Sequence, residues 1–342
     1  MNTKLLKAKS PDDISAINEA GEILRNGGLV AIPTETVYGL AASAFNCESV
    51  HNVFKAKGRP GDNPLIVHIS DISELEEITC NVSEKAKMCM KAFWPGPFTA
   101  IVEKTDKIPS AVSGGLNTVA VRMPSNDVAR AIIHAAGVPL AAPSANISGS
   151  PSPTTAKHVI NDLFGKIDAI VISNDCSVGV ESTVVSFCGG APKLLRPGGI
   201  TPEQLRKIVP DLIIDPAVTE KINPNAVVSS PGMKYRHYAP NSDVTMVIGS
   251  SEKFCEFCNK NKEKFELAIC YDQDAENTVL KTLSLGDIKD HAAQAERLFS
   301  ALRTVDEMKI KTVVVHAPST DGIGLAVYNR LIRAAGFKVI KL

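Results

Sequence analysis

Apolar segments with helical spacing alternate with short apolar runs over the first 210 residues. Ile14, Ile17, Ala20, Ile23 and Leu24 keep helical spacing up to Gly27-Gly28, which predicts a helix that ends at these glycines. The same pattern predicts helices at about 49–56, in two stretches up to 92, and at 127–136, 154–164 and 202–209. It predicts strands at 29–32, 65–69, 98–103, 119–124, 139–142, 169–173, 182–187 and from 193 onward.

The spacing of these strands predicts the type of sheet. The strands within 98–122 and within 169–195 follow one another too closely for a crossover helix between each pair. A purely parallel, doubly wound sheet is therefore excluded. We predict an α/β domain over residues 1–210 with a mixed, twisted sheet.

The regular pattern breaks down over residues 211–243, where prolines recur. The segment Ser230–Pro240 within it is aromatic and basic, whereas flexible tethers are rich in Ser and Gly and disordered segments avoid aromatics. We expect a docked linker. Its Tyr235 and His237 suit a lid over an anionic, purine-bearing ligand, and the alternative is that the aromatics only hold two domains together.

Residues 244–342 return to a simple alternation. Strands are predicted at 244–248, 267–271, 312–316 and 338–342, and helices at 252–264, 291–307 and 325–335. This pattern predicts a small Rossmann-like α/β domain, although no G-x-G-x-x-G fingerprint is present. Cys255 and Cys258 form a C-x-x-C pair with no second pair at zinc spacing, so we interpret them as packing residues.

Composition narrows the function classes. Lys and Arg number 37, as do Asp and Glu, so the chain has no overall nucleic-acid signature and any contact with RNA must be local and weak. The polar N-terminus is unlike a signal peptide, and no apolar run reaches membrane-spanning length. The eight cysteines show no disulfide framework. We expect a cytoplasmic protein without a membrane segment.

Three cations lie within five residues at Lys55, Lys57 and Arg59. Pro60 and Pro64 stiffen the following turn, which lowers the entropy cost of holding the charges in place. Most such clusters are solvated surface charge. Rigid cations beside the end of a strand instead suggest a polyanion site, with phosphate as the commonest ligand. We expect Lys57 and Arg59 to lie on a solvent-facing loop.

Polar side chains recur where predicted strands end, at Thr34, Arg122, Ser144 and Arg196. Open α/β sheets assemble their sites at strand ends. The chain has no P-loop, no G-x-S-x-G elbow and no H-E-x-x-H motif. Lys, Arg, Ser, Thr and Asn bind and orient anions without forming an obvious covalent intermediate. Phosphoryl or nucleotidyl transfer needs little beyond such positioning and charge stabilisation.

Several motifs in order resemble those of the YrdC-domain family. Lys57-Gly58-Arg59 and Ser144-Ala145-Asn146 resemble its K-x-R…S-x-N signature. Other landmarks that look like those of the family are Pro33–Leu40, Asp62–Leu65, Trp94–Pro97 and Leu195–Gly198. The linker and the added Rossmann-like domain match the long, two-domain form of the family, so the resemblance covers nearly the whole chain.

The resemblance implies a reaction. The family condenses L-threonine, bicarbonate or CO2, and ATP to threonylcarbamoyl-adenylate and pyrophosphate. Mg2+ would accompany ATP, and no metal ligands are assigned to the protein itself. The product would pass to the transferase proteins that modify adenosine beside the anticodon of tRNA.

The resemblance also implies roles for individual residues. Lys57 and Arg59 would be catalytic, because they would neutralise charge on the phosphates. The threonine pocket would consist of Thr36, His68, Arg122, Ala142 and Ser182, although His68 could instead be a core histidine. ATP would be held by Lys57, Arg59, Asn63, Thr118, Ser144, Asn146, Ser152 and Arg196, with Tyr235 and His237 added from the linker.

Two alternatives remain open from the sequence. The first is an RNA-binding module, against which the neutral overall charge argues. The second is a YrdC-like enzyme that acts on another carbamoyl substrate, as in the hydrogenase-maturation carbamoyltransferases. The acylphosphatase and zinc-finger segments of those proteins are absent from this sequence.

Overall fold

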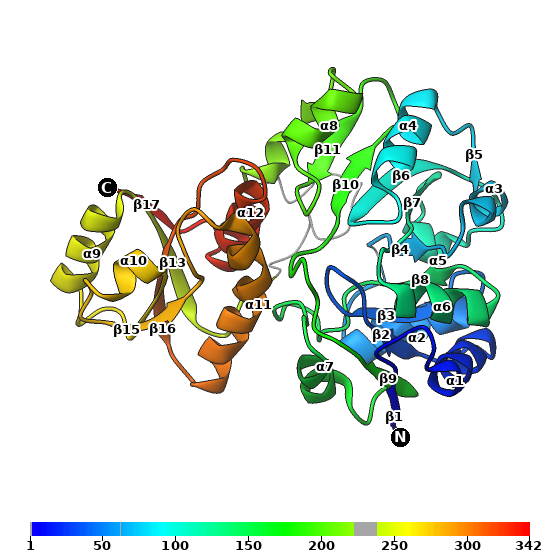
Figure 1. Cartoon of the computed structure of the whole chain (residues 1–342), viewed down its shortest axis with the longest axis horizontal. Coiled ribbons are helices and arrows are strands. Elements are labelled where there is room, and N and C mark those ends of the chain that lie inside the picture. Colours follow the sequence, from blue (N-terminus) through cyan, green and yellow to red (C-terminus); the bar gives the residue numbers. More distant parts are fainter. Residues whose placement is uncertain (1, 62, 222–237) are drawn as a thin grey trace. The chain divides into compact units, whose positions relative to one another are not determined.

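The computed structural model describes residues 2–61, 63–221 and 238–342 (Figure 1). The chain divides into two compact units. The first contains residues 2–148 and Ser152–Val218, and the second contains Gly149–Pro151, Thr219–Lys221 and residues 238–342. Both units are α/β, as the sequence predicts.

The first unit is built on a large mixed sheet. Its strands are β1 (Lys4–Lys7), β2 (Val30–Ile32), β3 (Gly39–Ser43), β4 (Ile66–His68), β5 (Thr79–Cys80), β6 (Phe98–Lys104), β7 (Thr118–Arg122), β8 (Leu140–Ala141), β9 (Ala169–Ile172), β10 (Thr183–Ser186), β11 (Lys193–Arg196) and β12 (Ile213–Ile214). They lie in the order β1-β9-β2-β3-β8-β4-β7-β6-β10-β11-β12, and β5 pairs with β6. Because parallel and antiparallel pairs occur together, the predicted mixed sheet is confirmed.

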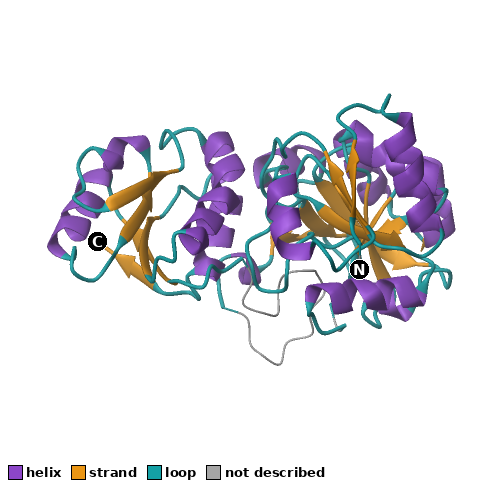
Figure 2. Cartoon of the chain, turned by 90° about the horizontal axis from the view of Figure 1, so that it is seen from below, coloured by secondary structure: helices purple, strands orange, loops and turns teal. Residues whose placement is uncertain are grey.

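Helices cover this sheet in Figures 1 and 2. They are α1 (Ile14–Arg25), α2 (Cys47–Lys57), α3 (Leu75–Ile78), α4 (Glu84–Phe93), α5 (Ser110–Ser113), α6 (Asp127–Ala136), α7 (Ala156–Leu163) and α8 (Pro202–Ile208). Helices α1 and α6 pack closely together. A Cβ atom on Gly21 would lie 2.7 Å from the backbone of Ala135, so only glycine permits this approach.

Side chains in the middle of the sheet alternate between two apolar clusters. Val67, Val119 and Val121 belong to the main core beneath the helices. Their neighbours Ile66 and Ala120 belong to a separate small cluster with Ile101, Val184 and Leu195. This period of two shows that the strands from β4 to β11 present a second, distinct face. The candidate site is built on that face.

Four strands of the first unit are not predicted from the sequence pattern. β1 is predicted as no element, because it is short and pairs only with β9, far along the chain. β3 is not predicted as a strand, because Gly39 and small alanines carry little strand signal. β5 and β12 have two residues each. Since β12 pairs with β11, the first unit extends beyond the boundary expected at residue 210.

The second unit has a five-stranded sheet in the order β15-β14-β16-β13-β17, and all of its pairs are parallel. The strands are β13 (Asp243–Ile248), β14 (Leu267–Cys270), β15 (Lys281–Ser284), β16 (Thr312–His316) and β17 (Val339–Lys341). Helices α9 (Ser251–Lys260), α10 (Asp272–Ala275), α11 (His291–Glu307) and α12 (Gly324–Ala334) connect them. The Rossmann-like layer is confirmed, and Cys255 and Cys258 are buried packing residues of α9.

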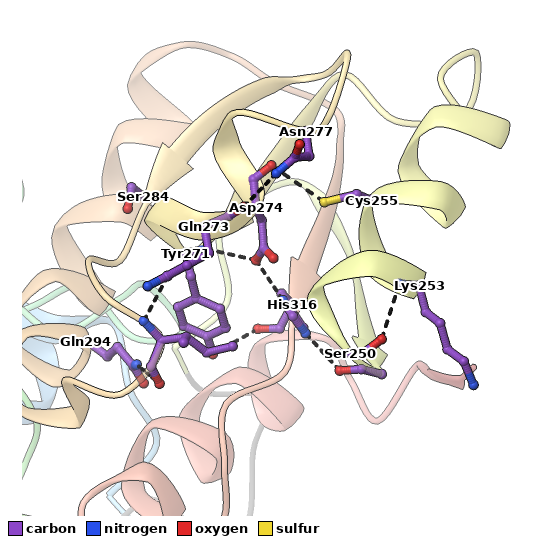
Figure 3. A network of polar contacts seen from close by, with 12 residues as sticks. Ser250, Lys253, Cys255, Tyr271, Gln273, Asp274, Asn277, Ser284, Gln294 and His316 are labelled. Atoms are coloured by element: carbon purple, nitrogen blue, oxygen red, sulfur yellow. Dashed lines mark hydrogen bonds and ion pairs between the residues drawn. The ribbon is translucent and has the colours of Figure 1, made fainter.

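A buried hydrogen-bonded pair, His316 and Asp274, links strand ends in the second unit (Figure 3). Nδ1 of His316, the last residue of β16, lies 2.7 Å from Oδ2 of Asp274, and Nε2 lies 3.0 Å from the carbonyl oxygen of Gly249. The Phe254 ring stacks on the imidazole at a centroid distance of 4.5 Å. The pair therefore joins α10 to the ends of β13 and β16.

Among the described residues, no helix has the length and apolar character needed to cross a membrane.

Candidate active site

The second face of the sheet brings together residues that are far apart in sequence. Thr118, Ala120 and Arg122 alternate with core residues on β7 and so share one face, and His68 follows Ile66 on the neighbouring strand β4. Four residue steps along β7 separate Thr118 from Arg122 by about 13 Å. The face therefore has a small apolar floor with polar groups at both ends.

Arg122 is the centre of a buried polar group at one end of this face. The residue as a whole is 3% exposed. Its Nη1 donates to Oγ1 of Thr36 at 2.8 Å and its Nε donates to the Gly96 carbonyl oxygen at 3.3 Å. Its Nη2 lies 2.7 Å from Oε1 of Glu35, which forms a buried ion pair. Two residues of the predicted threonine-binding pocket, Thr36 and Arg122, are therefore in direct contact.

His68 lies directly beside Arg122, because the two are register partners in the parallel pair β4–β7. Its side chain is buried and its Nδ1 lies 3.2 Å from the Ile66 carbonyl oxygen. Burial and the nearby charge of Arg122 lower the pKa of His68 to about 3. His68 is therefore a neutral group at the site, and the amide of Ala142, which donates to the Ile66 carbonyl at 2.9 Å, places that residue close by.

Ser182 and Arg196 form a second polar cluster. Arg196 donates from Nε to the Ser182 carbonyl oxygen at 3.0 Å and from Nη2 to its Oγ at 3.1 Å. Oγ of Ser182 also lies 2.7 Å from Oγ1 of Thr99 on β6. A Cβ on Gly198 would lie 2.4 Å from the Glu181 carbonyl, so the glycine of the Leu195–Gly198 stretch permits this close approach.

Lys57 differs from the expectation of a solvent-facing loop, which is wrong for this residue. It is the last residue of α2, and only 2% of it is exposed. Its Nζ donates to the carbonyl oxygens of Ser144 at 2.5 Å and Asn146 at 2.7 Å. The apolar face of α2 carries Lys57 inward, and Gly58 in the left-handed region (φ 62°) ends the helix. Lys57 thus ties the two halves of the K-x-R…S-x-N signature together.

The loop that contains Ser144 and Asn146 is held against the segment Pro33–Leu40. Gly39 and Ser144 form an isolated antiparallel bridge. Oγ of Ser144 donates to Oδ1 of Asn146 at 2.6 Å. Because β8 runs antiparallel to β4, this loop lies toward the start of β4, at the end of the face away from Arg122.

Asn63 precedes β4 at that same end. The residue is fully buried, and neither its Oδ1 nor its Nδ2 has a hydrogen-bond partner among the described residues. A buried amide without partners is costly, which favours a ligand as its partner. Thr118 begins the adjacent strand β7, so the two predicted ATP residues lie near each other.

The other predicted ATP residues are placed less closely together. Ser152 is buried and hydrogen-bonds through Oγ to Oε1 of Glu181, the residue before Ser182. Arg59 is half-buried after the end of α2. Tyr235 and His237 lie outside the described residues, as does the rest of the proposed lid from 222 to 237.

Three polar residues of this site are missing from the sequence prediction. Glu35 pairs with Arg122, Thr99 contacts Ser182, and Glu181 contacts Ser152. Glu35 could have been found, because it lies between two threonines directly after a buried strand. Thr99 and Glu181 carry no comparable signal, since only the sheet order brings β6 beside β10.

Comparisons with known proteins agree with this geometry. A sequence profile of the Sua5/YciO/YrdC family, described as telomere recombination, matches residues 22–198. A second profile, described as threonylcarbamoyl-AMP synthase C-terminal domain, matches residues 200–336.

Full-length relatives are also named threonylcarbamoyl-AMP synthase. The chain is 42% identical to the threonylcarbamoyl-AMP synthase of Bacillus subtilis, with all of both proteins covered. It is also 42% identical to the Pyrococcus abyssi enzyme, covering 95% of this chain and 96% of the relative. The crystal structure of Pyrococcus abyssi Sua5 complexed with L-threonine is 39% identical, covers all of both chains and superposes with a TM-score of 0.91. The chain therefore belongs to the Sua5/YciO/YrdC family and has its long form with the Sua5 C-terminal domain.

Proposed function

We propose that the protein is an L-threonylcarbamoyladenylate synthase, a nucleotidyltransferase that condenses L-threonine, bicarbonate or CO2, and ATP. The single observation that carries this proposal is the face between β4 and β11. It holds a buried arginine cluster at one end and a lysine-tied loop with a buried, unpartnered amide at the other. The spacing of about 13 Å suits two substrates that react between these ends.

We place threonine at the Arg122 end. A planar guanidinium pairs with a carboxylate through two parallel hydrogen bonds, which makes Arg122 the partner for the amino acid carboxylate. Thr36, His68, Ala142 and Ser182 would complete this pocket. His68 is neutral there, because burial and Arg122 lower its pKa to about 3.

We place ATP at the Lys57 end. Asn63, Thr118, Ser144, Asn146, Ser152 and Arg196 would hold it, and Tyr235 and His237 would cover it. In the proposed reaction the threonine amine adds to CO2 and loses a proton, giving a carbamate. A carbamate oxygen then attacks the α-phosphorus, and the bond to the β,γ-diphosphate breaks so that pyrophosphate leaves. Lys57 and Arg59 would stabilise the charge on the phosphates.

Mg2+ fits this site only as a companion of ATP. The described residues hold no cluster of three or more acidic, histidine or cysteine side chains that could form a metal cage. Mg2+ commonly keeps several waters and binds substrate phosphates with one or two carboxylates. Glu181, next to Ser152 and Ser182, is a carboxylate that could serve. When bound with ATP, the ion would neutralise phosphate charge.

The product, threonylcarbamoyl-AMP, is a mixed anhydride that water destroys, so it must be used soon after release. We propose that it passes to transferase proteins that modify tRNA and that the reaction takes place in the cytoplasm.

The decisive experiment incubates the full chain with ATP, threonine and labelled bicarbonate. The expected result is pyrophosphate release that requires all three substrates, together with label in an adenylate. Pyrophosphate release that does not depend on threonine would contradict the proposal. Release with another carbamoyl donor in place of threonine and bicarbonate would favour the second alternative.

A further inference from the structure

Glu35 and Arg122 form an unusual ion pair. The two side chains are 8% and 4% exposed, and Oε1 of Glu35 lies 2.7 Å from Nη2 of Arg122. By strict hydrogen-bond geometry neither carboxylate oxygen of Glu35 nor Nη2 of Arg122 has a partner among the described residues, although Arg122 and the backbone amides of Ser125 and Glu35 lie close enough to the carboxylate to lower its pKa. The charges compensate each other, but both groups keep hydrogen-bonding capacity.

A buried carboxylate without hydrogen bonds is costly, and the same is true of a guanidinium nitrogen. The pair thus offers one unsatisfied anionic acceptor and one unsatisfied cationic donor side by side. An α-amino acid is the matching ligand, because it carries an ammonium group and a carboxylate on the same carbon. A ligand with a carboxylate alone would satisfy Arg122 but would meet the negative charge of Glu35.

The protonation state of Glu35 supports this reading. Burial raises the pKa of the Glu35 carboxyl, but the charge and hydrogen bonding of Arg122, together with the backbone amides of Ser125 and Glu35, lower it more, so the pKa lies below its ordinary value. The group is therefore an anion at neutral pH. The position of Glu35 is also fixed, because the next residue, Thr36, is fully buried and its Oγ1 accepts a hydrogen bond from Nη1 of Arg122 at 2.8 Å.

We propose that Glu35 is the specificity-determining residue that recognises the α-ammonium group of the amino acid substrate, while Arg122 takes its carboxylate. This inference rests on the proposed placement of the threonine pocket. Glu35 would select by attraction and by repulsion together. It binds the zwitterion, and its charge rejects hydroxy acids and keto acids that lack the amine.

The test measures binding of two probes by isothermal titration calorimetry to the full chain. L-Threonine carries both charged groups. (R)-3-Hydroxybutyrate keeps the carboxylate, the hydroxyl and the methyl group but lacks the amine. The variant is Glu35→Gln, which keeps the size of the side chain and removes the charge. Glu103→Gln, an exposed glutamate on β6, is the matched control.

The expected result is opposite for the two probes. In Glu35→Gln, threonine should bind roughly 10- to 100-fold more weakly, the range for losing a hydrogen bond to a charged group. (R)-3-Hydroxybutyrate should bind at least as tightly as it does to the unaltered protein, because the repelling charge is gone. A merely structural role for Glu35 cannot produce a gain for one ligand and a loss for the other.

Equal weakening of both probes would overturn the proposal, since Glu35 would then act only by holding Arg122. Unchanged threonine binding would overturn it as well. If Glu35→Gln has a low Tm, the titrations are carried out at a lower temperature, where the variant is folded. The rise in Tm that each probe causes then gives a second comparison of the two probes. Arg122→Ala distinguishes a failure of the Glu35 proposal from a failure of the proposed threonine pocket. If the unaltered protein binds threonine and Arg122→Ala binds it equally well, the pocket lies elsewhere, whatever Glu35 does.

Discussion

Lys57 and Asn146 are 89 positions apart in the sequence, yet Nζ of Lys57 donates to the Asn146 carbonyl oxygen at 2.7 Å. The second acceptor of the same ammonium, the Ser144 carbonyl, lies two residues earlier. The lysine of the signature therefore builds the loop that carries the serine and asparagine of the signature. Its role is structural as well as electrostatic.

Lys57→Ala should therefore lose stability and activity together. Two carbonyls lose a charged donor in a buried setting, which costs about 1–3 kcal/mol. We expect a lower Tm and pyrophosphate release reduced by on the order of a hundredfold. Differential scanning fluorimetry and a pyrophosphate assay measure the two effects. Lys55→Ala, on the exposed side of the same helix, is the control and should change neither. A Tm equal to that of the unaltered protein would show that the bonds to the loop add no stability.

Arg59→Ala should separate the two effects. Arg59 is half-buried beyond the end of α2, so its loss should change the Tm little while turnover falls by roughly a hundredfold. Arg206→Ala, at an exposed site on α8, is the matched control. Unaltered turnover in Arg59→Ala would remove this residue from the proposed phosphate site.

Arg122→Ala should raise the threonine KM much more than the ATP KM, because its proposed partner is the amino acid carboxylate. It should also lower the Tm, since Glu35 is left as an uncompensated buried charge. Adding Glu35→Gln to Arg122→Ala should restore part of the Tm but not the threonine KM. Steady-state kinetics and thermal melts test this, with the surface variant Arg130→Ala for comparison. Equal effects on both substrates would mean that Arg122 serves a different ligand.

His68 should make stability depend on pH. Its pKa is about 3 in the folded protein, against an ordinary value of 6.5, so the unfolded chain binds the extra proton between these values. His68 therefore causes no loss of stability above pH 6.5. As the pH falls from 6.5 toward 3, the free energy of unfolding decreases by up to about 1.4 kcal/mol per pH unit.

Urea unfolding between pH 7.5 and 4.5 measures this dependence. His68→Asn should flatten the slope, whereas His134→Asn, at an exposed histidine of α6, should leave it unchanged. An unaltered slope in His68→Asn would assign the dependence to other groups.

Asp274→Asn tests the contact between Asp274 and His316 in the second unit. Burial raises the pKa of Asp274, but the hydrogen bonds to His316 and Ser251, the interaction with His316 and the backbone of Tyr271 together lower it more, so the pKa lies below its ordinary value. The carboxylate therefore stabilises the fold above pH 3.8, and this contribution is lost as pH falls through the lower folded pKa. At neutral pH we expect Asp274→Asn to cost about 1–3 kcal/mol, as for losing a buried hydrogen bond to a charged group. Hydrogen exchange of β13 and β16 measures the loss, and Asp287→Asn on the surface is the control. Unchanged protection would contradict a stabilising role.

The sequence predicts the elements with long apolar runs and the class of both sheets, because periodicity and strand spacing are local properties. It does not predict β1 or β3, whose pairing depends on partners far along the chain or on small residues. The same division holds at the site. Arg122 is visible as a charge at a strand end, whereas Thr99 becomes visible only once β6 lies beside β10. Lys57 is expected on a solvent-facing loop because the predicted helix ends at about residue 56; once the helix extends through Lys57, its spacing from Val53 and Phe54 puts it on the buried face.

The pairing of β1 with β9 affects how the chain is made. The register partners Lys4 and Ala169 are 165 positions apart, so β1 is synthesised long before its partner strand Ala169–Ile172. Until then the edge of β2 that β9 covers has no partner, and the apolar face of α1 is covered only in part, by α6. Long-range pairing of this kind folds slowly and exposes apolar surface. The second unit needs no such wait, because all of its strands come from residues 243–341. The nascent first unit is therefore the part of this protein that most needs protection from aggregation.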